Sequence, residues 1–151
     1  MTLSEAKKIK LSEHFTLYEA IYSRKAIDLN IDNEPNKYII NNLTQVCKTI
    51  LEPIRRRYGK PIVITSGYRS IKLNAIVGGS STSQHKHGTA IDFHPQDKND
   101  MKLLWNLILD MIRDGEIECR QLIDEYNLSW IHISINDKYH SYKQNNILHL
   151  K

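Results

Sequence analysis

Side chains that can bind a metal crowd one short stretch of the chain. His85, His87 and His94 fall within ten residues, and Asp92 lies among them. Imidazole and carboxylate groups are typical ligands of catalytic zinc, which takes three protein ligands and keeps one position open. Polar loops also collect such residues, so the cluster alone leaves two hypotheses, a metal site and an ordinary polar loop.

Another histidine lies far along the chain in a strand-like pattern. Isoleucines alternate with other residues over residues 129–135, which predicts a strand. Successive side chains of a strand point to opposite faces, so one face carries isoleucine and the other carries Trp130, His132 and Ser134. A histidine between an aromatic and a hydroxyl residue suits the wall of a cleft, although an exposed face of an antiparallel sheet would look the same.

Asp92 lies in a second predicted strand, over residues 88–93. In that strand Ala90 and Asp92 share one face, and Thr89, Ile91 and Phe93 share the other. If this strand and the one around His132 are neighbours, Asp92 and His132 converge.

The elements that must position these groups can be predicted from periodicity. Apolar residues recur at three- and four-residue steps over residues 37 to about 58, which predicts a helix that Pro53 kinks and Gly59 ends. Residues 61–66 are β-branched and predict a buried strand. Residues 71–77 predict a short helix.

Caps and alternation predict the remaining elements. Thr16 and Glu19 have the spacing of a capping box. Residues 97–100 offer N-cap side chains for a helix over residues 101–113, and residues 121–124 predict a weak strand. Helices come first, followed by short strands with one helix between them, which predicts an α+β fold with a small, largely antiparallel sheet.

Composition limits the classes of protein to consider. The chain has 151 residues, 40% hydrophobic and 25% charged, which is typical of one compact globular domain. We expect a polar N-terminal arm over residues 1–10 and a single domain over residues 11–151. The net charge of +4 is mild and the basic residues are scattered, so we expect no nucleic-acid partner. Cys47 and Cys119 lie in no CxxC pattern, so no cysteine zinc site is predicted.

Several segments together resemble a known family. Residues 83–92 (S-Q-H-K-H-G-T-A-I-D) resemble the S-x-H-x-x-G-x-A-x-D signature of the zinc D-alanyl-D-alanine carboxypeptidases. Residues 130–134 (W-I-H-I-S) resemble the closing W-x-H-x-S segment of that family, and residues 66–70 (S-G-Y-R-S) resemble its S-G-Y-R-S turn. Residues 121–125 (Q-L-I-D-E) and 12–17 (S-E-H-F-T-L) are similar to segments of its small, single-domain members. The family includes L-alanyl-D-glutamate endopeptidases and shares the hedgehog/DD-peptidase fold.

The resemblance implies a ligand set and a cofactor. The zinc ligands of the family match His85, Asp92 and His132, which would hold one zinc ion. Two imidazoles and one carboxylate leave one position for water, whose pKa zinc lowers toward about 7. The implied activity is hydrolysis of a peptide bond next to a D-amino acid in peptidoglycan stem peptides, by a carboxypeptidase or an endopeptidase.

A general base is also required, and the sequence leaves its identity open. Glu125 is the candidate, because it matches the acidic residue of the Q-L-I-x-E stretch. Many enzymes of the family carry the acid three residues before the last histidine, where this chain has Ser129. Asp124 is the neighbouring alternative. Ordinary charge at a strand end would explain either acid equally simply.

The S-G-Y-R-S turn supplies the candidate substrate anchor. The planar fork of Arg69 can bind a carboxylate through two hydrogen bonds, and wall stem peptides carry free carboxylates. Arg69 could instead bond only the carbonyls of its own turn. Tyr68 is a further candidate for substrate binding, and Ser83 could bind substrate or orient His85.

The resemblance also implies partners and a place of action. We expect a monomer that acts on peptidoglycan, with no membrane partner, since no apolar run approaches the roughly 20 residues that span a bilayer. The N-terminus carries no apolar stretch typical of a secretory signal, so we expect synthesis in the cytoplasm and action on the wall after holin-type release or as part of a virion. A non-catalytic zinc-containing wall-binding or virion module of the same fold is the alternative.

Overall fold

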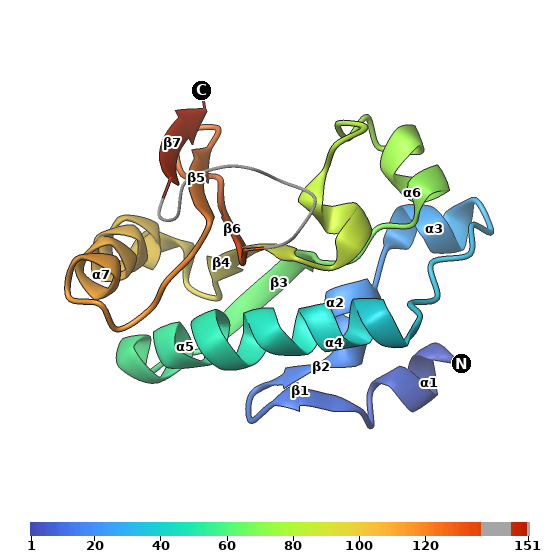
Figure 1. The fold of residues 1–151 in the computed structure, drawn as a ribbon, viewed down its shortest axis with the longest axis horizontal. Coiled ribbons are helices and arrows are strands. Elements are labelled where there is room, and N and C mark those ends of the chain that lie inside the picture. Colours follow the sequence, from blue (N-terminus) through green and yellow to red (C-terminus); the bar gives the residue numbers. More distant parts are fainter. Residues whose placement is uncertain (137–145, 151) are drawn as a thin grey trace.

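A five-stranded sheet forms the centre of the computed structural model, which describes residues 1–136 and 146–150 (Figure 1). Its strand order is β3-β4-β6-β5-β7. The strands are β3 (Ile62–Ser66), β4 (Ala90–Pro95), β6 (Trp130–Ser134), β5 (Gln121–Glu125) and β7 (Asn146–Leu150). All neighbours pair antiparallel except β5 and β7, which are parallel. The predicted α+β fold with a largely antiparallel sheet is therefore confirmed.

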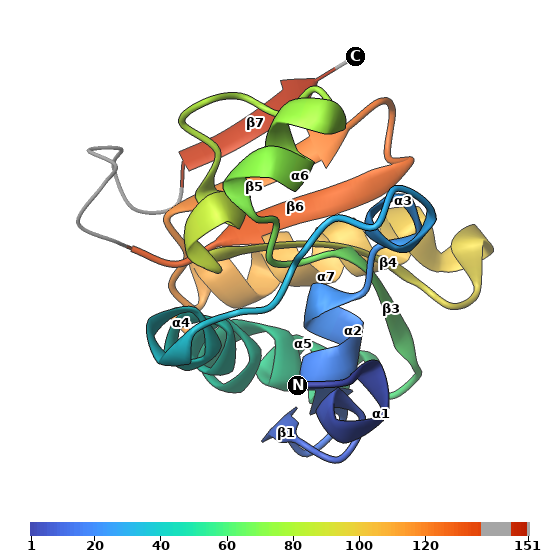
Figure 2. The ribbon, with the colours of Figure 1, turned by 90° about the vertical axis from the view of Figure 1, so that its right-hand side faces the viewer.

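Helices cover the sheet and carry most of the core. In the described part of the chain they are α1 (Leu3–Ala6), α2 (Leu17–Ile21), α3 (Arg24–Asp28), α4 (Lys37–Val46), α5 (Glu52–Tyr58), α6 (Ile71–Ile76) and α7 (Met101–Arg113). Ile91 and Phe93 of β4 are buried with Leu104 and Ile108 of α7 in one hydrophobic core. The neighbours of Ile91 and Phe93 along β4, Asp92 among them, point to the opposite face. Figure 2 shows α6 on the other side of β5 and β6 from α7.

The predicted helix over residues 37–58 forms with an irregular middle. Between α4 and α5 the segment η1 (Cys47–Leu51) is a π-helical turn, and Pro53 lies in the first turn of α5. Proline lacks the backbone N–H that an α-helix needs, and a wider turn before it accommodates that loss. Gly59 ends α5 in a left-handed conformation, as predicted.

The N-terminal segment is folded onto the domain. It forms α1, and a small hairpin of β1 (Lys10–Ser12) and β2 (Phe15–Thr16) follows. Ala6 is fully buried in the core. Thr16 caps α2 in a capping box with Glu19, as predicted. The division into an arm and one domain stays a prediction.

Two short 3-10 turns complete the chain, η2 (Gln84–His87) and η3 (Lys98–Asp100). The start and end predicted for α7 are both confirmed.

The prediction that β3 is a buried strand is wrong. Among the described strands it pairs only with β4, so it lies at the edge of the sheet, and the side chains of Val63 and Thr65 on its open face are exposed. None of the described helices has the length and apolar character needed to cross a membrane.

Candidate metal centre

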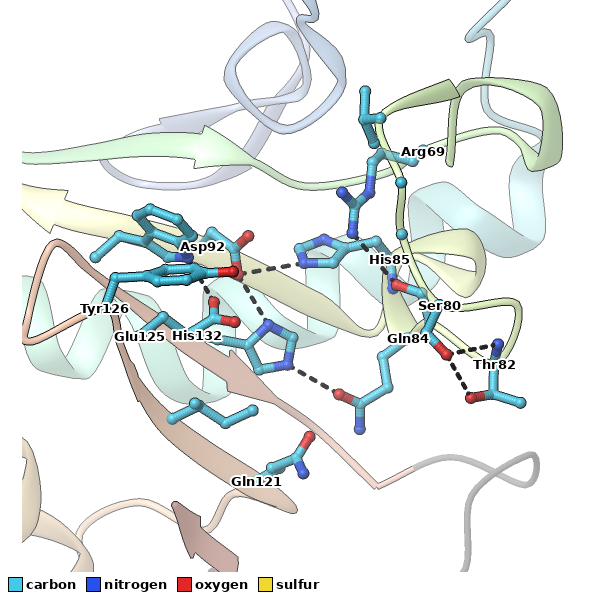
Figure 3. A pocket seen from close by; sticks show the side chains of 16 residues that line it. Arg69, Ser80, Thr82, Gln84, His85, Asp92, Gln121, Glu125, Tyr126 and His132 are labelled. Atoms are coloured by element: carbon cyan, nitrogen blue, oxygen red, sulfur yellow. Dashed lines mark hydrogen bonds and ion pairs between the residues drawn. The ribbon is translucent and has the colours of Figure 1, made fainter. Parts of the chain in front are cut away.

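Three side chains from separate segments point toward one another in Figure 3. His85 Nε2 lies 3.2 Å from Asp92 Oδ1, and His132 Nδ1 lies 2.8 Å from the same oxygen. Each of the three residues offers one potential ligand atom, and these three atoms lie within 4.8 Å of one another. Two imidazoles and one carboxylate are a donor set typical of catalytic zinc, so these residues fit that metal.

Strand register and a 3-10 turn bring these groups together. Asp92 in β4 pairs directly with His132 in β6, so the two strands are neighbours, which was the condition for these side chains to converge. Directly paired residues on neighbouring strands place their Cβ atoms about 5 Å apart, which leaves room for a shared ion. His85 comes from η2, which Gly88 ends in a left-handed conformation, and the Arg69 N–H donates to the His85 carbonyl at 3.0 Å.

Hydrogen bonds orient the two histidine rings differently. His85 Nδ1 lies 2.7 Å from the Gly67 carbonyl, which can only accept, so Nδ1 carries the proton and Nε2 faces Asp92. His132 turns Nδ1 toward Asp92 and Nε2 toward the side-chain amide of Gln84. Each ring therefore has one nitrogen held by the protein and one directed at the common centre.

The electrostatics keep Asp92 ionised. Burial alone would raise the pKa of Asp92, whose side chain is 13% exposed. When the His85 and His132 rings are protonated, their charge and hydrogen bonds outweigh burial and lower that pKa well below its ordinary range. An ionised carboxylate between two imidazoles is the state that binds a cation.

The three residues line an open cavity of about 510 Å³. Arg69 and Glu125 line the same cavity, together with Ser83 and the exposed loop residues Ser80 and Thr82. The Arg69 guanidinium contacts Ser83 Oγ at 3.4 Å, and Arg69 Nε is buried without a hydrogen-bond partner among the described residues. The Arg69 guanidinium and the Glu125 carboxylate give the cavity two charged groups besides the cluster.

Comparison with known protein families agrees with this arrangement. The family model described as Peptidase M15 matches residues 13–134, which is most of the chain. The chain belongs to the peptidase M15 family. It is therefore a zinc metallopeptidase, and the predicted family and enzyme class are confirmed. No match was found among curated proteins.

Glu125 is half-buried in the cavity wall of this M15 peptidase. Its carboxylate accepts a hydrogen bond from the Trp130 indole N–H. Burial raises the pKa of Glu125, the negative charge of Asp92 raises it further, and His132 and Trp130 offset part of the increase. Asp124, by contrast, is not among the lining residues, and its carboxylate accepts from the Leu128 N–H in the following turn.

Other predicted residues occupy different places in the M15 peptidase. Ser83 caps the 3-10 turn by accepting from the His85 N–H at 3.2 Å. Tyr68 is not among the residues that line the cavity, because its ring packs against the hydrophobic core. This burial raises the pKa of Tyr68. His87 and His94 also lie outside the described lining of the cavity.

No sequence pattern predicts a role for Gln84 or Tyr126, although both line the cavity of the M15 peptidase. Gln84 precedes His85 within the signature, and this position is the one feature of the sequence that points to Gln84 as a site residue. Tyr126 begins a turn of three consecutive left-handed residues and stacks its ring 4.9 Å from that of Trp130. This turn contains no glycine, so the residue types alone do not predict its left-handed backbone.

Proposed function

We propose that this M15 peptidase hydrolyses a peptide bond next to a D-amino acid in the stem peptides of bacterial peptidoglycan. The observation that carries the proposal is that His85, Asp92 and His132 converge in a cavity that Arg69 and Glu125 also line. In this proposal the three converging residues hold one zinc ion. A D,D-carboxypeptidase and an L-Ala-D-Glu endopeptidase both fit this cavity.

Zinc, when bound, acts as a Lewis acid that polarises the scissile carbonyl and makes water a better nucleophile. The chain supplies the remaining functions. Glu125 takes the proton of the attacking water and hands it to the leaving amine, so that one residue serves as base and then as acid. The direction of its pKa shift supports this role, because burial and the charge of Asp92 favour the protonated form that returns the proton.

Arg69 is the proposed anchor for a substrate carboxylate. Its guanidinium lines the cavity and, among the described residues, makes one side-chain hydrogen bond, of 3.4 Å to Ser83, which leaves its fork available for a carboxylate. Holding that carboxylate fixes the distance to the scissile carbonyl. Ser83, which contacts both Arg69 and the His85 backbone, joins the anchor to a proposed ligand.

Digestion of purified peptidoglycan with and without a zinc chelator tests the proposal. New amino and carboxyl termini, read by mass spectrometry, should appear only without chelator and should identify the bond. His132→Ala serves as the inactive control. Intact peptidoglycan after incubation with the zinc-loaded wild type would instead favour the non-catalytic wall-binding alternative. Monomeric state and release by holin-type lysis or from a virion stay predictions.

A further inference from the structure

Gln84 is a buried amide side chain that contacts a proposed ligand on another element. It precedes His85 in η2 and is 5% exposed. Its Oε1 lies 2.9 Å from His132 Nε2 in β6, a contact drawn in Figure 3. Its Nε2 donates to Ser134 Oγ at 2.9 Å, and Ser134 is fully buried.

These contacts specify the protonation of the His132 ring. An amide oxygen only accepts hydrogen bonds, so a hydrogen bond to Gln84 Oε1 requires that His132 Nε2 carry the proton. A neutral imidazole has one N–H, which leaves the lone pair on Nδ1. That nitrogen is the one that lies 2.8 Å from Asp92 Oδ1.

We propose that Gln84 is a positioning residue that holds His132 as the Nε2–H tautomer and thereby aims Nδ1 at zinc. This inference rests on the proposed function, in which His132 is a ligand. Metal-binding histidines commonly donate their second N–H to a fixed acceptor, which sets the tautomer and the ring orientation. Ser134 fixes the acceptor in turn, because it holds the amide nitrogen of Gln84 and so orients the oxygen toward the ring.

The arrangement couples two ligands through one short turn. Gln84 and His85 are neighbours in η2, so the turn that supplies one ligand also orients the other. His85 is oriented by the backbone carbonyl of Gly67, which no side-chain substitution removes. Gln84 is therefore a side chain whose replacement removes an orienting contact and leaves every ligand in place.

The tautomer can be measured directly in the wild type. Long-range proton–nitrogen NMR spectra of the ¹⁵N-labelled, zinc-loaded protein distinguish a protonated ring nitrogen from a metal-bound one. We expect His132 to show a protonated Nε2 and a Nδ1 shifted by zinc. A protonated Nδ1 with zinc on Nε2 would overturn the inference, and this result requires no variant to fold.

Two variants separate orientation from packing. Gln84→Met fills similar space without an acceptor and should weaken zinc binding roughly 10- to 100-fold, measured by chelator competition. Gln84→Glu keeps an oxygen at the same reach and should bind zinc within about threefold of the wild type, or more tightly. A role in packing alone predicts the reverse order, since methionine suits a buried site better than a carboxylate does.

His132→Ala distinguishes a failure of the inference from a failure of the proposed function. If the wild type binds zinc tightly, His132→Ala does not, and Gln84→Met matches the wild type, the positioning role is overturned while the ligand set stands. Equal zinc affinity of the wild type and His132→Ala would overturn the proposed ligand set, and the inference with it.

Discussion

Two carboxylates in the cavity have pKa values displaced in opposite directions. Burial opposes ionisation of Asp92, but two histidines outweigh it and lower its pKa. Burial and the charge of Asp92 raise the pKa of Glu125. Groups whose environments separate their pKa values in this way commonly divide the work of a site between a fixed charge and a proton carrier. Asp92 suits a cation ligand, and Glu125 suits proton transfer.

Replacing Glu125 by Gln tests this division. The amide keeps the shape of the side chain but cannot take a proton, so turnover of peptidoglycan should fall by roughly 100-fold or more. Zinc content, measured by metal analysis of the same sample, should match that of the wild type. Asp124→Asn is the matched control and should keep its activity, because Asp124 is not a lining residue and its carboxylate accepts from the Leu128 N–H. If activity survives in Glu125→Gln and disappears in Asp124→Asn, the general base is Asp124 and not Glu125.

Arg69 should act on the substrate carboxylate. Loss of a charge-assisted pair in Arg69→Ala should cost roughly 2–4 kcal/mol of transition-state binding, or about 30- to 1000-fold in kcat/KM. Arg69→Lys should recover only part of this, because lysine lacks the planar fork. The measurement compares cleavage of a wall peptide with cleavage of its amidated counterpart. If the wild type cleaves the wall peptide and its amidated counterpart equally well, Arg69 does not bind a substrate carboxylate and its role is structural.

Some contacts of the candidate metal centre follow from strand alternation in the sequence, and others depend on how a turn packs against the sheet. The convergence of Asp92 and His132 could be predicted, because alternation in each strand states which side chains share a face. The contact between Gln84 and His132 could not, because the direction of a side chain in a 3-10 turn depends on how the turn docks on the sheet. The same holds for Tyr68, whose turn enters the cavity through Arg69 while its own ring packs on the core.

At the scale of elements, the turn after β3 joins the candidate metal centre to α2. The Tyr68 N–H donates to the Ala20 carbonyl at 2.7 Å, and the Gly67 carbonyl accepts from His85. A Cβ on Gly67 would overlap the backbone carbonyl of Ala20. Glycine is therefore required at this close approach of two backbones.

Gly67→Ala should consequently disturb the metal centre from outside it. The added methyl group must push the turn away from α2 and move the carbonyl that orients His85, so zinc affinity should fall by roughly tenfold or more. Gly115→Ala is the control. Gly115 has a φ of 74°, and a methyl group there would meet no atom of the described residues within 4 Å. Its replacement should therefore cost about 1–2 kcal/mol of stability through backbone strain and leave zinc affinity unchanged. Equal zinc affinities of Gly67→Ala and the wild type would contradict this account of the turn.

Local patterns predicted elements better than they predicted pairing. The start and end of α7 follow from cap residues and periodicity, and both agree with the structure. The edge position of β3 and the parallel pairing of β7 with β5 depend on contacts between distant segments. A short β-branched run looks the same in the middle and at the edge of a sheet, and the strand order shows that β3 lies at the edge.

At the scale of the whole molecule, a buried carboxylate fastens the N-terminal hairpin to the helical layer. Glu52, only 1% exposed, accepts hydrogen bonds from the Ser12 hydroxyl at 2.8 Å and the His14 N–H at 2.7 Å. His14 Nδ1 lies 2.6 Å from its other oxygen. Burial alone would raise the pKa of Glu52, but these hydrogen bonds outweigh it and lower the pKa.

Because the pKa of Glu52 is lowered in the fold, the free energy of unfolding should depend on pH through this residue. A carboxyl group whose pKa is lower in the folded than in the unfolded state stabilises the fold above its unfolded pKa, and this contribution disappears as the pH falls through the folded pKa. At pH 7, Glu52→Gln should therefore lower the free energy of unfolding by about 1–3 kcal/mol. Urea unfolding at a series of pH values should show the difference from wild type shrinking toward acid. A difference that stays constant with pH would show that the charge of Glu52 is not involved.

The central claim is that one zinc ion, held by His85, Asp92 and His132, makes this M15 peptidase a peptidoglycan hydrolase. Titration of the metal-free protein with zinc, following the rate at which new peptide termini appear in purified peptidoglycan, tests it most directly. The rate should rise in proportion to added zinc and level off at one equivalent per chain. The claim would be contradicted by full activity before zinc is added, or by no activity at any amount of zinc.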